Sequence, residues 1–304
     1  MSRLTTETEA RGHASGKVIL LGEHAVVHGE PALAVALDRG VTAVAHRSDG
    51  PLVMYADSWQ YRASADQDSA PARALRALCG VLGVEPSGAT VELDPQIPPR
   101  AGLGASAALA VAVARSLASL FDLPLSNETL LAAAHASECV FHGNPSGLDA
   151  AVSSSGKTVL FSKSNGAKII PEAAPSLLIV HSGFPKDTAA SVARFAARIK
   201  AYPEEASRRM ARIGALARRG VEMLQQHNLV TLGALMTENH RHLQWFDISS
   251  SALDRIVEIA LEAGALGAKL TGGGRGGCAV ILLPPNPQPV LAAIRDSEFQ
   301  AVVS

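Results

Sequence analysis

A glycine-rich turn that opens directly into a helix is predicted at residues 98–108, with the sequence Pro98-Pro99-Arg100-Ala101-Gly102-Leu103-Gly104-Ala105-Ser106-Ala107-Ala108. Glycines allow a backbone to approach a ligand closely, and the first N–H groups of a helix carry partial positive charge. The two features together suit an oligophosphate. Ser106 is expected in the first helical turn, where its hydroxyl can join the shell of a metal ion bound by those phosphates.

Two other interpretations of this turn are open from the sequence. The first is a structural turn whose small residues serve helix packing. The second is a dinucleotide-binding fold, because Gly102, Gly104 and Ala107 fit the spacing G-x-G-x-x-A. That motif should follow a parallel strand directly, but two prolines stand where the strand would end. The dinucleotide interpretation is therefore weak.

A second segment places a lysine and a Gly-Glu-His triplet at the two ends of an apolar run, over residues 16–24. The run is not a P-loop, because the lysine is followed by valine and the upstream glycine of that motif is missing. It is instead predicted to be a buried strand. At about 3.3 Å per residue, Lys17 and Glu23 would lie about 20 Å apart in a straight strand. Both can face one site only if the chain turns back at Gly22.

A third segment carries two carboxylates on either side of a strong turn signal, Asn144-Pro145-Ser146-Gly147. Glu138 is expected near the end of a helix, and Asp149 just beyond the turn. Carboxylates in this arrangement can hold Mg²⁺ and accept a proton. Taken alone, the segment favours ordinary charges at helix ends for both carboxylates.

The fourth segment is a glycine cluster near the end of the chain, with five glycines among the six residues 272–277. So many glycines carry a large conformational entropy cost on folding, which makes a passive connector a poor explanation. The cluster favours a loop whose backbone wraps around a ligand.

The elements that must position these groups alternate without a regular βαβ pattern, so the chain is predicted to be α+β with two domains. Strands are expected at residues 17–21, 41–45, 90–93, 177–180 and 279–283. Helices are expected at 104–121, from an N-cap at Ser126 to about 141, and over most of 187–263 with an interruption at 249–251. A boundary near residues 167–175 gives an N-terminal domain of 1–170 and a C-terminal domain of 171–304.

The composition limits the function classes. With 47 % hydrophobic residues the chain can fill a core, and a net charge of -1 without long runs of one sign argues against nucleic-acid binding. No apolar stretch is long enough to span a membrane. Residues 1–12 are predicted to be a mobile lead-in and not a signal peptide. Cys79, Cys139 and Cys278 are too few and too far apart for a disulfide framework, which favours the cytoplasm.

Together the four segments, in this order, resemble the GHMP kinases, a superfamily that includes galacto-, homoserine, mevalonate and phosphomevalonate kinases. Residues 22–29, 141–149 and 267–272 look like the mevalonate kinases in particular. The resemblance implies an N-terminal domain like ribosomal protein S5 domain 2, a ferredoxin-like C-terminal domain and an active site between them. It also implies ATP and Mg²⁺ as cofactors and mevalonate as the small-molecule substrate. A homodimer is left open.

The resemblance further implies roles for individual residues by matching positions. Asp149 and Lys17 would be the catalytic groups that act on the C5 hydroxyl of mevalonate. Whether Asp149 takes the proton or only orients the hydroxyl is open. Ser106 and Glu138 would be the ligands of Mg²⁺.

Binding of mevalonate is implied for Glu23, His24 and Thr188. Binding of the nucleotide is implied for Pro99, Arg100, Ala101, Gly102, Leu103, Gly104, Ala105, Ser106, Ala107, Gly272, Gly273 and Gly274.

Three positions depart from the family pattern. Ala105 stands where the family usually has the first of two serines, which removes one hydroxyl. Arg275 stands where the family usually has glycine, and both a phosphate contact and a solvent-facing side chain are open. Arg100 adds a cation beside the phosphate loop. None of the three removes a catalytic group.

Two rival functions remain open from the sequence. One is a GHMP kinase for a different hydroxyl acceptor, such as phosphomevalonate or a sugar. The other is a ligand-binding protein that keeps the GHMP fold without catalysis. The second is less consistent with the sequence, because a sensor has no need of Lys17, Ser106, Glu138 and Asp149 together.

Overall fold

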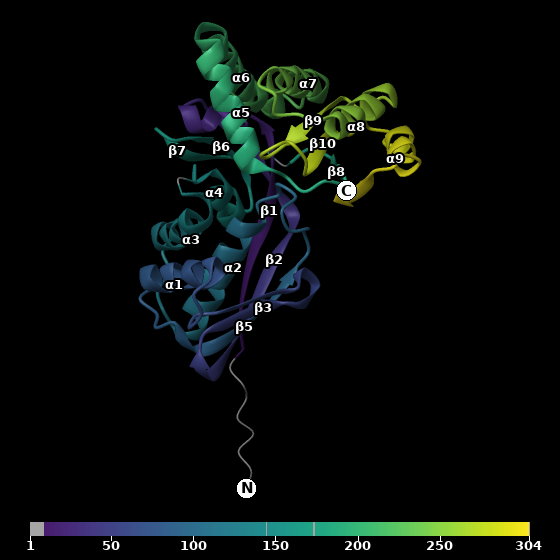
Figure 1. The fold of residues 1–304 in the computed structure, drawn as a ribbon. Coiled ribbons are helices and arrows are strands. Elements are labelled where there is room, and N and C mark those ends of the chain that lie inside the picture. The colour runs from purple at the N-terminus through teal and green to yellow at the C-terminus, as the bar shows by residue number, and fades with distance from the viewer. Residues whose placement is uncertain (1–8, 144, 173, 304) are drawn as a thin grey trace. The chain divides into compact units, whose positions relative to one another are not determined.

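The computed structural model describes residues 9–143, 145–172 and 174–303, and the chain forms two compact units. Each unit is assembled from three stretches of chain. Unit 1 contains the stretch ending at Gly16, then Asp38–Ile97 and Gly104–Gly156; unit 2 contains Lys17–Leu37, Pro98–Leu103 and the stretch beginning at Lys157. Both mix helices and strands, as expected for an α+β protein (Figure 1). The sequence boundary predicted between residues 170 and 171 stays a prediction.

The sheet of unit 1 is built on two long strands that also run into unit 2, β1 (Glu9–Leu21) and β2 (Ala32–Pro51). It continues through β3 (Val53–Ala56), β4 (Tyr61–Ser64) and β5 (Ser87–Pro95) in the order β4-β3-β5-β2. In β5, Ala89, Val91 and Leu93 are buried while their neighbours are more exposed. This period of two is what a strand with one buried face requires.

The helices of unit 1 are α1 (Ala70–Leu82), α2 (Ala105–Leu120), α3 (Asn127–His142) and α4 (Leu148–Ser155), with a short 3₁₀ turn η2 (Asp57–Trp59). Nearly every side chain of α2 is small or aliphatic, and most are buried, so α2 is the central helix of this core. The predicted helix at 104–121 is confirmed. So is the Ser126 cap, because its side chain accepts a hydrogen bond from the Thr129 N–H at 3.0 Å. Helix α4 was not predicted.

Unit 2 has two groups of strands. In the first, the beginning of β2 pairs with β6 (Thr158–Ser162), which pairs with β7 (Gly166–Ile170). The second is an antiparallel sheet in the order β11-β8-β10-β9, formed by β8 (Leu177–His181), β9 (Gly267–Thr271), β10 (Cys278–Leu282) and β11 (Gln300–Val303). The glycine loop of residues 272–277 joins β9 to β10, where Cys278 lies opposite Thr271.

The helices of unit 2 are α5 (Thr188–Ala201), α6 (Pro203–Gln225), α7 (Leu229–Trp245), α8 (Ser251–Glu262) and α9 (Gln288–Arg295), with a 3₁₀ turn η1 (Ala25–His28). Helices α7 and α8 pack against β9, and α9 packs against α8 (Figure 1). The helical region predicted over 187–263 is confirmed. Its interruption is also confirmed, because Ser250 caps α8 by accepting a hydrogen bond from the Leu253 N–H.

The lead-in predicted to end at Gly12 is partly wrong. Strand β1 begins at Glu9, and Gly12 packs so closely on α2 that an added Cβ would lie 2.2 Å from the Ala112 carbonyl oxygen. Residues 1–8, and Asn144 of the predicted turn, lie outside the described residues. All three cysteines are free thiols, as expected. Among the described residues, no helix has the length and apolar character needed to cross a membrane.

Candidate active site

The predicted phosphate turn leads into a helix start that is open to an anion. Gly104 is the N-cap of α2 in a left-handed conformation, with φ 74°. No side chain caps α2, and its first turn holds no acidic residue. The first N–H groups of the helix are therefore available to an anion, without a competing negative charge nearby in sequence. These features fit the phosphates of a nucleotide, and Ser106 lies in this first turn with its side chain partly exposed.

The two glycine-rich segments meet within unit 2. Gly272 has φ 77°, and a Cβ added to it would lie 3.0 Å from the carbonyl oxygen of Gly102. The backbones of the two loops thus touch directly, which only residues without side chains allow. The second half of β1 is tied to the same place, because the Lys17 N–H donates to the Leu103 carbonyl at 2.9 Å. The Lys17 side chain is itself buried.

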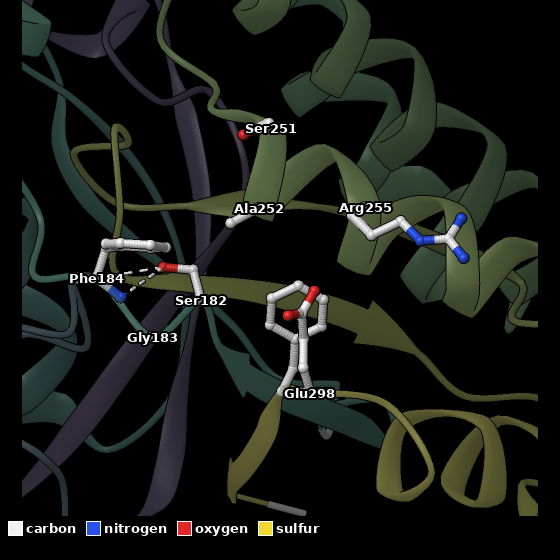
Figure 2. A pocket seen from close by; sticks show the side chains of 8 residues that line it. Ser182, Gly183, Phe184, Ser251, Ala252, Arg255 and Glu298 are labelled. Carbon is white, nitrogen blue, oxygen red and sulfur yellow. Dashed lines mark hydrogen bonds between the residues drawn. The ribbon is translucent and has the colours of Figure 1, made fainter.

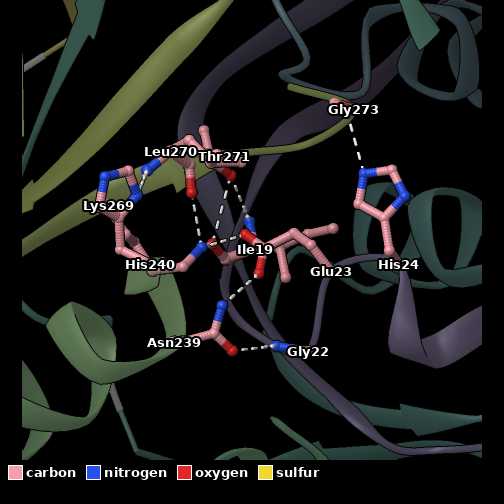
Figure 3. Close-up of polar contacts among 10 residues, drawn as sticks. All are labelled: Ile19, Gly22, Glu23, His24, Asn239, His240, Lys269, Leu270, Thr271 and Gly273. Atoms are coloured by element: carbon pink, nitrogen blue, oxygen red, sulfur yellow. Dashed lines mark hydrogen bonds and ion pairs between the residues drawn. The ribbon is translucent and has the colours of Figure 1, made fainter. Parts of the chain in front are cut away.

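The chain turns back after β1, which is the turn that Lys17 and Glu23 would need in order to face one site. Gly22 has φ 107° and His24 has φ 60°, both in the left-handed region. The turn brings the His24 ring to the glycine loop, where its Nε2 lies 3.0 Å from the Gly273 carbonyl oxygen (Figure 3). Thr188 lies beside the same glycine, since a Cβ added to Gly273 would lie 2.9 Å from Thr188 Oγ1. Three predicted ligand-binding residues are therefore gathered in one place.

His24 is a neutral imidazole at physiological pH. Burial lowers its pKa to about 4, and the hydrogen bond to Gly273 opposes this only in part. A carbonyl can only accept, so Nε2 must carry the proton and Nδ1 keeps its lone pair. The ring also stacks on Phe195 of α5, with 5.2 Å between ring centroids. His24 can therefore offer a hydrogen-bond acceptor to a hydroxyl, but it does not offer a positive charge to a carboxylate.

Glu23 differs from the expectation for a residue that contacts substrate. Its side chain is 1 % exposed and forms an ion pair with Lys269, which is fully buried in β9 (Figure 3). Sequence reasoning assigned no role to Lys269. The available signal was a lysine in the middle of an otherwise apolar strand, where a cation needs a buried partner. The predicted role of Glu23 in substrate binding stays a prediction.

The remaining candidates lie in unit 1 on three helices that pack on one another. Ser106 begins α2, Glu138 lies in the last part of α3, and Asp149 lies in the first turn of α4. Helix α2 contacts α3 and α4, and α3 contacts α4. Glu138 is buried and Asp149 is partly exposed. The fold thus collects a hydroxyl and two carboxylates in one unit, which are groups that suit a hard cation.

Arg275 contacts the connection between α7 and α8, and its side chain is partly exposed. Its φ is 55°, in the region that favours glycine, and its N–H donates to the Ile248 carbonyl at 2.8 Å. Its guanidinium donates to Asp247 Oδ1 at 3.2 Å and to the Ser249 carbonyl at 3.3 Å. Arg275 therefore fastens the glycine loop to the connection between α7 and α8.

We expect Arg275→Gly to leave turnover within about tenfold of wild type, a change of about 1.4 kcal/mol in barrier height. Glycine accepts the left-handed backbone better than arginine does, and the lost ion pair is partly exposed. Steady-state kcat is the measurement. A loss of several orders of magnitude would show that Arg275 supplies charge to the transition state.

A separate hollow of about 470 Å³ is lined by residues of the segment after β8, of α8 and of the segment before β11 (Figure 2). None of the predicted site residues lines it. Its buried hydroxyl, Ser182, is already engaged by the backbone of Phe184, and Arg255 pairs with Glu258. These polar groups of the described residues therefore give no indication of a ligand for this hollow.

Comparison with known proteins decides the family. Residues 70–157 match the GHMP kinases N terminal domain, and residues 221–298 match the GHMP kinases C terminal domain. The mevalonate kinase of Pyrococcus abyssi is 31 % identical over 306 residues, which cover 93 % of this chain and 91 % of that protein. The chain belongs to the mevalonate kinase family. As a GHMP kinase, it uses ATP.

Solved structures agree with this membership of the mevalonate kinase family. The crystal structure of L. major mevalonate kinase in complex with R-mevalonate aligns with a TM-score of 0.82 and 28 % identity, covering 99 % of this chain and 98 % of that one. The Methanococcus jannaschii mevalonate kinase aligns with a TM-score of 0.81 and 23 % identity, covering 98 % of both chains, and shows the shared fold. The predicted two-domain GHMP kinase fold is confirmed.

Proposed function

We propose that this chain transfers the γ-phosphoryl group of ATP to the C5 hydroxyl of mevalonate, giving 5-phosphomevalonate for isoprenoid synthesis. The observation that carries the proposal is a sequence identity of 31 % to two mevalonate kinases, over 93 % and 92 % of this chain. We further propose that the enzyme requires Mg²⁺ and works in the cytoplasm. A homodimer stays a prediction.

Phosphoryl transfer asks the protein mainly for alignment and for neutralisation of charge. The open N-terminus of α2 would bind the phosphates of ATP, together with the glycine loops. Ser106 and Glu138 would hold Mg²⁺, in part through water molecules. The bound metal would neutralise charge on the β- and γ-phosphates.

Activation of the acceptor hydroxyl is assigned to Lys17 and Asp149. An ammonium group favours the oxygen as it gains negative charge, and a carboxylate can accept the proton or orient the O–H bond. Asp149 suits an anionic role, because negative charge in the first turn of α4 is favoured by the helix dipole. His24 and Thr188 are assigned to mevalonate, with His24 Nδ1 accepting a hydrogen bond from a hydroxyl of the substrate.

An ADP-release assay across mevalonate, phosphomevalonate, homoserine and galactose tests the proposal. We expect the highest kcat/KM with mevalonate and a product phosphorylated at C5. A preference for another acceptor would assign the chain to a different GHMP activity. Binding of mevalonate without ADP release would indicate a ligand-binding protein that has kept the fold.

We expect Ser106→Ala to raise the apparent KM for Mg-ATP by about tenfold, because a hydrogen bond or ligand to a charged group is lost. Initial rates at varied magnesium and ATP measure the effect. Ser119→Ala is the matched control, since Ser119 is an exposed serine on the same helix. Unchanged apparent constants for Ser106→Ala would remove Ser106 from the metal shell.

A further inference from the structure

Lys269 is buried at the centre of β9 with all three of its ammonium hydrogens accounted for. It pairs with Glu23 Oε1 and donates to the Leu270 carbonyl at 2.6 Å and to the Ile19 carbonyl at 3.5 Å. An ammonium has three donors and no acceptor, so this set saturates it. Lys269 therefore links the end of β1 to β9 from inside the unit.

The carboxylate of Glu23 is also held on both sides. Its Oε1 meets Lys269, and its Oε2 accepts from Asn239 Nδ2 at 3.4 Å. The other end of the Asn239 amide accepts from the Gly22 N–H at 3.3 Å (Figure 3). Asn239 thus bridges the backbone of the turn and the Glu23 carboxylate. Both oxygens of Glu23 are thus engaged by side chains of the same unit, and the carboxylate is 1 % exposed.

The ion pair is a poor source of stability. Burial raises the pKa of the Glu23 carboxyl, although the charge of Lys269 opposes this, and burial lowers the pKa of Lys269. Both shifts mean that the fold disfavours the charged forms. Replacing such a pair by neutral groups of similar size is often neutral or stabilising, whereas removing one partner leaves an uncompensated buried charge. Stability alone therefore does not account for the presence of this pair.

The residue next to Glu23 supplies an explanation. His24 holds a left-handed φ of 60°, which a residue other than glycine keeps only when its surroundings enforce it. Gly273 and Phe195 fix the His24 ring on one side. On the other side, the backbone that leads into His24 is fixed by Asn239 and by the buried Glu23 side chain.

We propose that Glu23, Lys269 and Asn239 form a positioning network that sets the His24 imidazole against the glycine loop, and that Glu23 acts through His24 without touching mevalonate. This inference rests on the proposed function and deepens it. Lys269 and Asn239 are positioning residues for the acceptor site. In this proposal the effect of Glu23 on mevalonate binding is indirect.

A double-mutant cycle with Glu23→Gln, Lys269→Met and both together tests the network. Each single variant leaves one buried charge without its partner, so we expect kcat/KM for mevalonate to fall at least about tenfold in each. The double variant removes both charges of the pair and keeps an amide that can bond to Asn239. We expect kcat/KM of the double variant to exceed that of each single variant by at least about fivefold. Such a difference is a strong coupling between the two residues.

A direct contact between Glu23 and mevalonate gives a different result. The KM for mevalonate would then rise by the same factor whether or not Lys269 is present, and the double variant would be the worst of the three. That additive outcome would overturn the proposal. Glu30→Gln is the matched control, because Glu30 forms a partly exposed ion pair with Arg218 in the same unit. We expect this variant to change neither KM nor kcat/KM for mevalonate.

The His24 ring gives a readout that does not depend on turnover. Nitrogen chemical shifts of the imidazole, assigned with His24→Gln, should report the Nε2–H form in wild type and in the double variant, and a mixture in Lys269→Met. Identical His24 signals in all variants would overturn the proposal. If wild type does not phosphorylate mevalonate, the proposed function fails, while the His24 signals still test the network.

If Lys269→Met does not fold, Asn239→Ala provides the second test. It keeps the ion pair and removes the bridge to the Gly22 N–H. We expect a perturbed His24 signal and a higher KM for mevalonate. An unperturbed His24 signal together with an unchanged KM would show that the turn does not depend on this network.

Discussion

Replacing Asp149 by asparagine should lower kcat by about 10² to 10⁴ while the affinity for Mg-ATP stays close to that of wild type. Asparagine keeps the shape of the side chain but removes its negative charge and its ability to take a proton. Asp149 is partly exposed in the first turn of α4, so the substitution fits without repacking. Single-turnover kinetics and titration with a non-hydrolysable ATP analogue separate the chemical step from nucleotide binding.

The substitution also removes a favourable charge at a helix start, which is a stability effect of about 0.3–1 kcal/mol. Glu128→Gln is the matched control, because Glu128 is an exposed acid in the first turn of α3 in the same unit. Parallel loss of turnover and of Mg-ATP binding in Asp149→Asn would place Asp149 in the metal shell. Near-normal turnover would leave Lys17 and Mg²⁺ as the groups that activate the hydroxyl.

Gly22→Ala should destabilise the protein by about 3 kcal/mol or more, the second large effect that we expect. Gly22 has φ 107°, and an added Cβ would lie 2.4 Å from Ala32 Cα and 2.6 Å from the Pro31 carbonyl oxygen. Both atoms belong to the backbone and cannot move aside cheaply. Chemical denaturation followed by circular dichroism measures the loss.

Gly29→Ala separates backbone strain from the clash. Gly29 has φ 97°, similar to that of Gly22, but a Cβ added there meets no atom within 4 Å. We expect Gly29→Ala to cost about 1 kcal/mol, from the strained backbone alone. Equal destabilisation by the two substitutions would mean that the contact of Gly22 with β2 has no energetic weight.

The elements predicted most accurately were those with strong local signals. The helix at 104–121 is long and consists mainly of small and aliphatic residues, and Ser126, Asp187 and Ser250 cap their helices through their own side chains. A cap is a contact within three residues, so the sequence displays it directly. Short strands such as β4, β7 and β11 have few residues and depend on their partners for stability, which is why local patterns missed them.

The candidate site was predictable where it relies on motifs, and much less so where it relies on long-range contacts. The need for a turn at Gly22 followed from the strand rise, and the contact of His24 with the glycine loop agrees with it. The pairing of Glu23 with Lys269 joins residues 246 positions apart, and no local pattern announces such a partner. The contacts of Arg275 with Asp247 and Ser249 were not predicted for the same reason, because they lie outside its own segment.

The bonds that close unit 2 also set the order in which a newly made chain can fold. Ile19 and Thr271 exchange hydrogen bonds although 252 positions separate them. At about 5–20 residues per second, a ribosome needs about 13–50 s to make the intervening chain. During that time the apolar end of β1 and the Glu23 carboxylate cannot contact β9, because β9 has not yet been synthesised. The emerging chain must therefore keep this stretch from aggregating until almost the whole sequence has been translated.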